Sequence, residues 1–228
     1  MTLATLVALS AFVSLGRWQW HRGEAKQAVW AEYERNAGAQ ALGSRRIDEL
    51  PRFAHVEIDG SFAPEHQILL DNRSHQGQPG YEVLTPFLLM NGRMILVNRG
   101  WVPFTGYRDR LPDVSHVPWQ SGVYLKISGR IDELPAPGLA SGRAPPDAGA
   151  PWPRVTSFPT SEELSAALGE RLERRVLLLD ADVPGGYVRE WQPPGLDPSR
   201  HFSYAIQWWG FGVVLLVLYF GLNFRKVS

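Results

Sequence analysis

Residues 200–226 read RHFSYAIQWWGFGVVLLVLYFGLNFRK, an apolar run that opens beside a histidine and closes with two basic residues. Within Tyr204–Leu222 there is no charged side chain, and Gln207 carries the one amide. Such a run approaches the ~20 apolar residues that are needed to cross ~30 Å of hydrocarbon. We therefore predict a transmembrane helix at residues 199–223, followed by a cytoplasmic tail at residues 224–228.

A second apolar run begins the chain. Residues 1–16 carry only Thr and Ser as polar side chains before Arg17. The run is short for a span, but a secretory signal would show a basic start and a small-x-small cleavage site, and neither stands out. We predict a first transmembrane helix at residues 1–19, whose basic cytoplasmic start is expected to precede the given sequence. A cleaved signal is the alternative.

The basic residues beside the spans predict the orientation. Arg225 and Lys226 favour a cytoplasmic C-terminus by the positive-inside rule, and two spans place the N-terminus on the same side. Residues 20–198 then form one exported domain, because segments of that size are translocated largely regardless of their charge. In a bacterium, this domain would be periplasmic and both helices would lie in the inner (plasma) membrane, in contact with lipid.

Composition limits the chemistry. The chain has 23 Lys plus Arg and 23 Asp plus Glu, so no overall basic field favours nucleic acid as a partner. It has no cysteine, which excludes disulfides, thiol redox chemistry and cysteine-based metal delivery. With three methionines, a methionine-rich copper site is not expected either.

Between the two apolar ends, short hydrophobic bursts rich in β-branched residues predict strands. The predicted strands are residues 56–62, 67–70, 81–90, 93–98, 123–131 and 175–180. Asn91-Gly92 separates two of them, and this pair is a strong hairpin signal because both turn residues tolerate positive φ. The predicted fold is thus an α+β membrane protein with an antiparallel sheet; buried helical pieces are the alternative.

One or two short helices are expected outside the membrane. Glu24–Leu42 is rich in Ala, Gln, Glu and Lys and is predicted to continue the first span as a helix. Thr160-Ser161-Glu162-Glu163 is a capping box ahead of a helix predicted over Leu164–Leu172. Leu134–Pro153 is rich in Pro, Gly and Ala, which indicates a loop within the domain rather than a boundary.

Four motifs follow one another along the chain: LGRWQ at 15–19 with Arg22, GYEVLTPF at 80–87, VNRGWVP at 97–103 and HFSYAIQW at 201–208. Together they resemble the surfeit locus protein 1 family of cytochrome oxidase assembly factors, over nearly the whole chain. The resemblance implies a protein that is not an enzyme and that helps to mature haem-copper cytochrome c oxidase. In bacterial members it implies binding of haem a and its presentation to the catalytic subunit, with haem a synthase as a further candidate partner.

The beginning of the second span carries the residues suited to haem. Asp197 can cap the helix and Pro198 can occupy its first position, so His201 falls in the first turn. Helical geometry places one stripe on a single face: His201, Tyr204, Trp208 and Gly212. Imidazole is a normal axial ligand of haem iron, and the resemblance places the family's second-span histidine at His201.

Basic and aromatic residues near that level complete the predicted haem site. Arg17, Arg22 and Arg200 can pair with the propionates through charge-assisted hydrogen bonds, and Trp18 joins the predicted set. His21 is a conceivable second ligand. The alternative is an aromatic belt formed by Tyr204, Trp208 and Trp209, in which Trp208 packs helices rather than haem.

Asn98-Arg99-Gly100-Trp101 follows a predicted strand. We interpret it as structural, with Gly100 relieving a bulge or turn and Trp101 covering an edge of the core. The alternative is a partner-binding surface formed by Asn98, Arg99 and Trp101, since Arg and Trp anchor many interfaces.

No catalytic site is predicted, and no metal cluster apart from the haem site. The histidines at positions 55, 66, 75 and 116 lack the spacing of metal ligands. Asp71, Asn72, Arg73 and His75 have no accompanying nucleophile motif, so we interpret them as a polar strand end.

Overall fold

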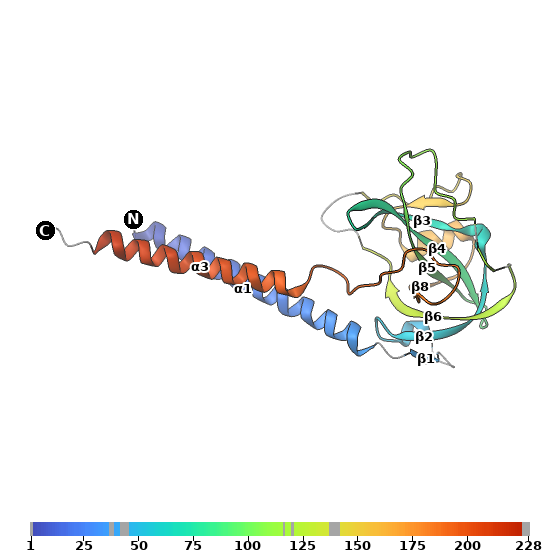
Figure 1. Ribbon diagram of the computed structural model, residues 1–228, viewed down its shortest axis with the longest axis horizontal. Coiled ribbons are helices and arrows are strands. Elements are labelled where there is room, and N and C mark those ends of the chain that lie inside the picture. The colour runs from blue at the N-terminus through green and yellow to red at the C-terminus, as the bar shows by residue number, and fades with distance from the viewer. Residues whose placement is uncertain are drawn as a thin grey trace. The chain divides into compact units, whose positions relative to one another are not determined.

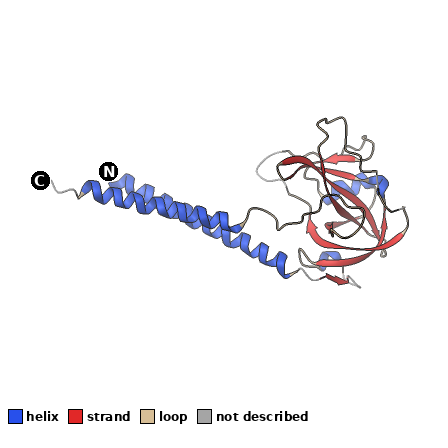
Figure 2. Ribbon diagram, in the orientation of Figure 1, coloured by secondary structure: helices blue, strands red, loops and turns tan. Residues whose placement is uncertain are grey.

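The computed structural model describes residues 2–36, 39–41, 46–115, 117–119, 121–136 and 142–224. His116 and the basic pair Arg225 and Lys226, on which the predicted orientation depends, lie outside the described residues. The chain divides into two compact units, drawn in Figures 1 and 2. One comprises helices α1 (Thr2–Arg35) and α3 (Pro198–Asn223), and the other is the β domain of Arg35–Gln192.

Among the described residues, α3 is the one helix whose length and composition would allow it to cross a membrane. Asp197 caps it by accepting a hydrogen bond from the amide of Ser199 at 2.8 Å, and Pro198 occupies its first turn, as predicted. Helix α1 does not meet these criteria of length and composition over its described residues, so the prediction of a second span is not confirmed.

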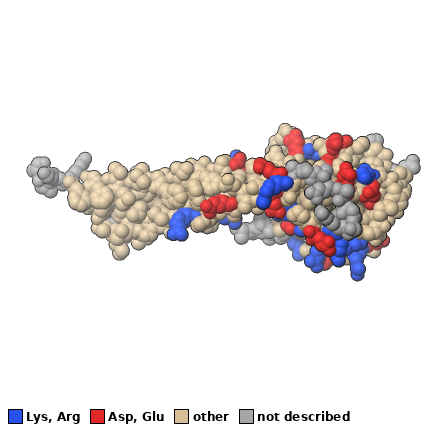
Figure 3. All heavy atoms as spheres, turned by 90° about the horizontal axis from the view of Figure 1, so that it is seen from below, with Lys and Arg blue, Asp and Glu red and all other residues tan. Residues whose placement is uncertain are grey.

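Helix α1 continues without interruption from the first predicted span, so the helix expected after Glu24 is the same helix. It ends at Arg35 rather than at Leu42, and Ala39–Ala41 form a strand. The helical unit therefore extends to Glu34. Our prediction from the sequence placed residues 20–34 in the exported domain. The half of the helical pair that carries the chain ends shows no charged side chain on the face drawn in Figure 3.

Small residues at heptad spacing bring the two helices together. Gly16 and Gly23 are buried on α1, and Ala205 and Gly212 are buried on α3. A Cβ at Gly16 would overlap the indole of Trp209, so glycine is required where this ring crosses the backbone. Small residues allow close approach of two helices, and a seven-residue repeat keeps one face of each against the other.

The β domain contains eight strands: β1 (Ala39–Ala41), β2 (His55–Phe62), β3 (Ile68–His75), β4 (Gln78–Leu89), β5 (Met94–Pro103), β6 (Tyr124–Glu133), β7 (Arg154–Thr156) and β8 (Leu172–Leu179). Their order is β1-β2-β6-β8-β5-β4-β3-β7, and β2 also pairs with β4. This additional pairing closes β2, β6, β8, β5 and β4 into a barrel. All six predicted strands are present, with ends that differ by a few residues.

The prediction of an antiparallel sheet was wrong in part, because the sheet is mixed. The pairs β1–β2, β3–β7 and β5–β8 are parallel. The chain between β5 and β8 is long enough for a crossover, which parallel pairing requires. Strands β1 and β7 were not predicted, since three residues are too few to show an alternating pattern.

The hairpin at Asn91-Gly92 is confirmed between β4 and β5, although its two residues act differently. Gly92 has a φ of 77°, whereas the Asn91 side chain accepts a hydrogen bond from the amide of Arg93 at 3.0 Å. The capping box of α2 (Ser161–Leu168) is also confirmed, with Thr160 and Glu163 bonded reciprocally at 3.2 and 2.9 Å. This helix ends four residues earlier than predicted, because Gly169 adopts a left-handed C-cap with φ 70°.

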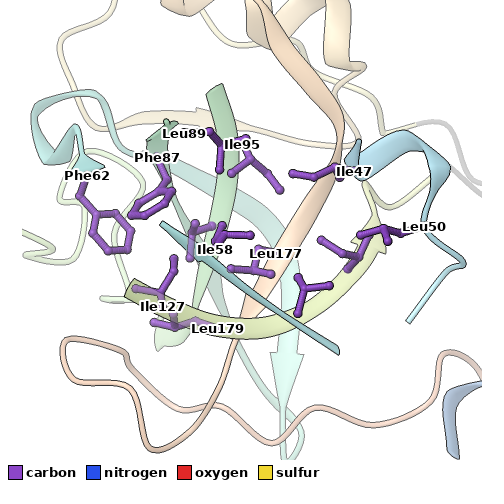
Figure 4. Packing of buried hydrophobic residues seen from close by; sticks show 13 residues of the cluster. Ile47, Leu50, Ile58, Phe62, Phe87, Leu89, Ile95, Ile127, Leu177 and Leu179 are labelled. Atoms are coloured by element: carbon purple, nitrogen blue, oxygen red, sulfur yellow. The ribbon is translucent and has the colours of Figure 1, made fainter. Parts of the chain in front are cut away.

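The main core lies inside the barrel, where side chains from β2, β4, β5, β6 and β8 point toward one another (Figure 4). Ile47 and Leu50, from the short 3-10 helix η1 (Ile47–Glu49) and the residue after it, lie at one end of this cluster, and Phe62 and Phe87 lie at the other. A second 3-10 helix, η2 (Pro64–His66), precedes β3. Trp119 stacks on Phe62 with ring centroids 4.0 Å apart.

Candidate functional site

In the helical unit, the imidazole of His201 is oriented by Gln19. Nδ1 of His201 lies 2.9 Å from Oε1 of Gln19. Because an amide oxygen only accepts, Nδ1 is the donor, and in the neutral ring Nε2 then keeps its lone pair. No hydrogen bond between Nε2 and another described residue occupies that lone pair. A histidine held through one ring nitrogen with the other open is the arrangement found in metal-ligating histidines.

The helical pair places these two side chains opposite each other. Gln19 follows Gly16 by three residues and precedes Gly23 by four, so it lies on the contact face of α1. His201 precedes the buried Ala205 by four residues and lies on the contact face of α3. Gln19 was not predicted as a site residue. Its spacing to two glycines in the LGRWQ motif was the signal that could have identified it.

Aromatic rings fill the contact beside this pair. Trp20 packs against Phe202 and Trp209, with centroids 4.8 and 5.7 Å away. Trp208 stacks on Phe12 at 5.9 Å, which is the helix-packing role that the sequence also allowed. The rings therefore hold α3 and its histidine in register with α1.

The other predicted haem-site residues surround the pair without entering the contact. Tyr204 is 50% exposed and Trp18 is 55% exposed, so both present aromatic surface outward. Ala205, rather than Tyr204, is the buried residue at this level of α3. Arg17 and Arg200 are exposed, and no salt bridge to a described residue fixes either guanidinium.

His21 is turned toward its own helix. Its Nδ1 lies 3.1 Å from Oε2 of Glu24, and the side chain is 67% exposed. Within the described helices His21 has no contact with His201, so the structure does not bring the conceivable second ligand to the first.

The second candidate region, Asn98-Arg99-Gly100-Trp101, lies in β5, and its arginine is 1% exposed. The Arg99 guanidinium donates to Oε1 of Gln67 at 2.8 Å and to the carbonyl of Gly185 at 2.8 and 2.6 Å. It also lies between the rings of Trp119 and Tyr187, about equally far from each at 5.0 and 4.9 Å. Burial lowers the pKa of Arg99, whereas Tyr187 acts in the opposite direction. Arg99 therefore joins strands and loops from inside the domain.

Asn98 and Gly100 are also structural. Asn98 is 2% exposed; its side chain donates to Oε2 of Glu82 at 2.7 Å and accepts from the amide of Gly100 at 3.0 Å. Gly100 has φ 111°, and a Cβ there would lie 2.5 Å from the carbonyl of Val188. The structural interpretation fits these contacts. Asn98 and Arg99 are enclosed and present no side chain to a partner, which corrects their place in the predicted docking surface.

Trp101 is partly exposed, and it is the residue of that surface that remains available. Its ring lies 5.3 Å from the ring of His75, and its backbone pairs with Val188. The indole Nε1 is buried without a hydrogen-bond partner among the described residues.

The described residues contain no group of three or more His, Asp or Glu side chains that could hold a metal ion. His55 pairs with Asp180 at 2.6 Å, His66 packs on Trp152, and His75 lies 3.9 Å from Glu190. Each of these histidines thus has a local partner.

Comparison with known proteins identifies the relatives. The model of the SURF1 family matches residues 6–213. A SURF1-like protein of Rickettsia bellii is 32% identical over 226 residues, which cover 95% of this chain and 88% of that protein. An uncharacterised SURF1-like protein of Mycobacterium bovis is 31% identical over 164 residues, or 72% of this chain, and the match spans 57% of that relative. The chain belongs to the SURF1 family, as its four motifs predicted.

Proposed function

We propose that this protein assists the assembly of haem-copper cytochrome c oxidase by holding haem a at His201 and presenting it to the catalytic subunit. Family membership supports the role in oxidase assembly. The observation that carries the haem proposal is the 2.9 Å contact between Gln19 and His201, which leaves Nε2 of the imidazole open.

The residues around His201 fit the chemistry of a haem. Imidazole nitrogen is a common axial ligand of haem iron. Exposed aromatic surface at Trp18 and Tyr204 suits an apolar macrocycle, and the exposed guanidiniums of Arg17 and Arg200 suit propionates. Haem a is cargo in this proposal: it supplies the iron centre that the oxidase later uses, and this chain binds, orients and releases it unchanged.

The membrane setting is part of the same proposal. Helix α3 provides a candidate span, and we infer that α1 accompanies it as a second pass, with both termini cytoplasmic. In a bacterium, the β domain then lies in the periplasm and the helices lie in the inner membrane. Lipid surrounds the apolar surface of the helices. His201 lies in the first turn of α3, which in this proposed topology is the end of the helix at the outer boundary of the membrane.

The decisive experiment is a pyridine-haemochrome assay on the detergent-purified protein after co-expression with the enzymes that make haem a. Wild type should retain haem a, and His201→Ala should lose it. Gln19→Leu should weaken haem retention about 10- to 100-fold, the usual effect of removing a group that orients a metal ligand. His21→Ala is the matched control, since it removes an exposed imidazole from the neighbouring helix.

If His201→Ala retained haem a at the wild-type stoichiometry, the proposed site would be wrong. If wild type carried no haem, a second candidate would take precedence: a scaffold that binds oxidase subunits or assembly intermediates through the β domain. The partly exposed Trp101 supports this candidate. A pull-down of the catalytic subunit that Trp101→Ala leaves unchanged would count against that surface.

A further inference from the structure

A cavity of about 780 Å³ lies at one end of the sheet in the β domain. The start of β8 is parallel to the start of β5, and Met94 pairs with Leu172. The end of β6 is antiparallel to β8, and Glu133 pairs with Arg175. The topology therefore gathers three strand ends, together with the 3-10 helix η1, around one space.

Cations predominate in the lining of this cavity. Five arginines contribute to it: Arg46, Arg93, Arg171, Arg174 and Arg175. Asp48 and Glu133 are its lining acids. The chain as a whole is neutral, so this excess of positive charge is local. Such a concentration of one sign raises the local concentration of oppositely charged ligands.

The inner guanidiniums are already fixed in place. Nε of Arg93 lies 2.8 Å from Oε1 of Glu173, whose side chain is 2% exposed. Nη1 of Arg175 donates to the carbonyl of Leu50 at 2.7 Å. A ligand that binds here would not have to order these two side chains, which lowers the entropic cost of binding.

The outer guanidiniums are exposed, and Arg174 interacts electrostatically with Glu162, which lines the adjoining cavity. Arg171 and Arg174 are exposed, and neither forms a salt bridge with another described residue. The planar fork of a guanidinium matches a carboxylate with two parallel hydrogen bonds. The fixed and the exposed arginines together provide several positions at which carboxylates of a ligand could bind within one cavity.

A smaller cavity of about 400 Å³ adjoins the first and shares Glu133 and Arg174 with it. Its lining includes five apolar residues: Leu134, Pro135, Ala136, Phe158 and Pro159. The two cavities together suit an elongated ligand with carboxylates at one end and an apolar group next to them. Inorganic phosphate would leave the apolar part unused.

We propose that the arginine-lined cavity and its apolar neighbour bind an extended acidic peptide segment of a partner protein. The peptide places carboxylates on the arginines and an apolar side chain against Phe158 and Leu134. A polypeptide offers this alternation because successive side chains of an extended strand point to opposite sides. This binding site is separate from His201 and goes beyond the role in carrying haem.

The test uses the full chain in detergent and a fluorescein-labelled peptide of alternating Glu and Leu, with binding measured by fluorescence anisotropy. The control peptide has Gln in place of Glu. We expect the acidic peptide to bind and the control to bind at least about tenfold more weakly, since hydrogen bonds to charged groups dominate. Arg174→Glu and Arg171→Glu should each weaken binding by about tenfold or more.

Arg110→Glu is the matched control variant, because Arg110 is exposed on the same domain outside both cavities. It should leave the affinity unchanged. Equal binding of the two peptides, or an equal loss with Arg110→Glu, would overturn the proposal. The proposal would also be overturned if inorganic phosphate displaced the peptide more than chloride does at equal ionic strength. Displacement of the peptide by anionic phospholipid added to the micelles would overturn it as well. The haem content of Arg174→Glu should remain at the wild-type value, which separates this test from that of the haem site.

Discussion

Arg99 connects several elements of the β domain from within, and its replacement should be among the most costly single changes in the chain. In Arg99→Met, the side-chain volume is largely kept while the guanidinium is removed. The carbonyl of Gly185 then loses both hydrogen bonds from Arg99, and among the described residues Oε1 of Gln67 keeps the hydrogen bond from Thr85, at 3.2 Å.

The magnitude follows from these partners. A buried acceptor left unpaired costs about 1–3 kcal/mol, and a hydrogen bond to a charged group contributes about 1.5–3 kcal/mol. Removing the guanidinium also relieves the cost of burying it, as the lowered pKa of Arg99 indicates. We therefore expect Arg99→Met to lower the free energy of unfolding by about 3 kcal/mol.

The assay is thermal unfolding of the full chain in mild detergent, followed by tryptophan fluorescence. For a chain of this size, about 3 kcal/mol corresponds to a fall in Tm of roughly 6–12 °C. Arg110→Met is the control, since Arg110 is exposed and its guanidinium contacts only the ring of Tyr107 among the described residues. A fall of less than about 2 °C for Arg99→Met would refute the view that Arg99 holds the domain together.

Two further predictions concern the helices. Gly16→Ala should separate α1 from α3, because its Cβ would overlap Trp209, and should therefore reduce haem retention. Gly210→Ala is the control, because there is open space around the added methyl group, and it should keep haem retention at the wild-type value. Equal haemochrome yields from the two variants would contradict the prediction. Thr160→Ala should lower the free energy of unfolding by about 1 kcal/mol through loss of the N-cap of α2, measured by thermal unfolding at pH 7. The hydrogen bond from the Thr160 amide lowers the pKa of Glu163 most, and the hydrogen bond from Arg143 lowers it further. The stability that this carboxylate contributes is therefore present above its ordinary pKa and is lost as pH falls through the lowered pKa. The gap in Tm between wild type and Glu163→Ala, which lacks this carboxylate, should therefore narrow in acid, and a constant gap would argue against the capping box.

Local patterns predicted the elements of the β domain better than their arrangement. The alternation of β2, the Asn91-Gly92 turn and the capping box of α2 are encoded within a few residues, and all three are confirmed. The parallel pairing of β5 with β8 and the closure of β2 on β4 depend on residues far apart in the chain. Alternation reports which face of a strand is buried, but not the direction of its neighbour.

The candidate sites show the same division. His201 was predicted from the helix start and the family motif, whereas its partner Gln19 lies 182 residues earlier and becomes apparent only when the helices pair. Arg99 shows the opposite case. An arginine beside a tryptophan suggests an exposed anchor, but its partners come from the residue before β3, from β4 and from the loop before Tyr187, and they enclose it. A charged residue can be buried when its hydrogen bonds are met, and one local segment does not show whether they are.

The heptad of small residues links the fold of the helical pair to the proposed haem site. Gly16 and Gly23 set the face of α1 on which Gln19 lies, and Ala205 sets the face of α3 on which His201 lies. A change that separates the helices should therefore also release the imidazole from its orienting amide, even when both site residues remain. The arginine-lined cavity depends instead on strand ends in the β domain. Variants in the helical contact should thus alter haem retention without altering acidic-peptide binding, and variants in the cavity should do the reverse.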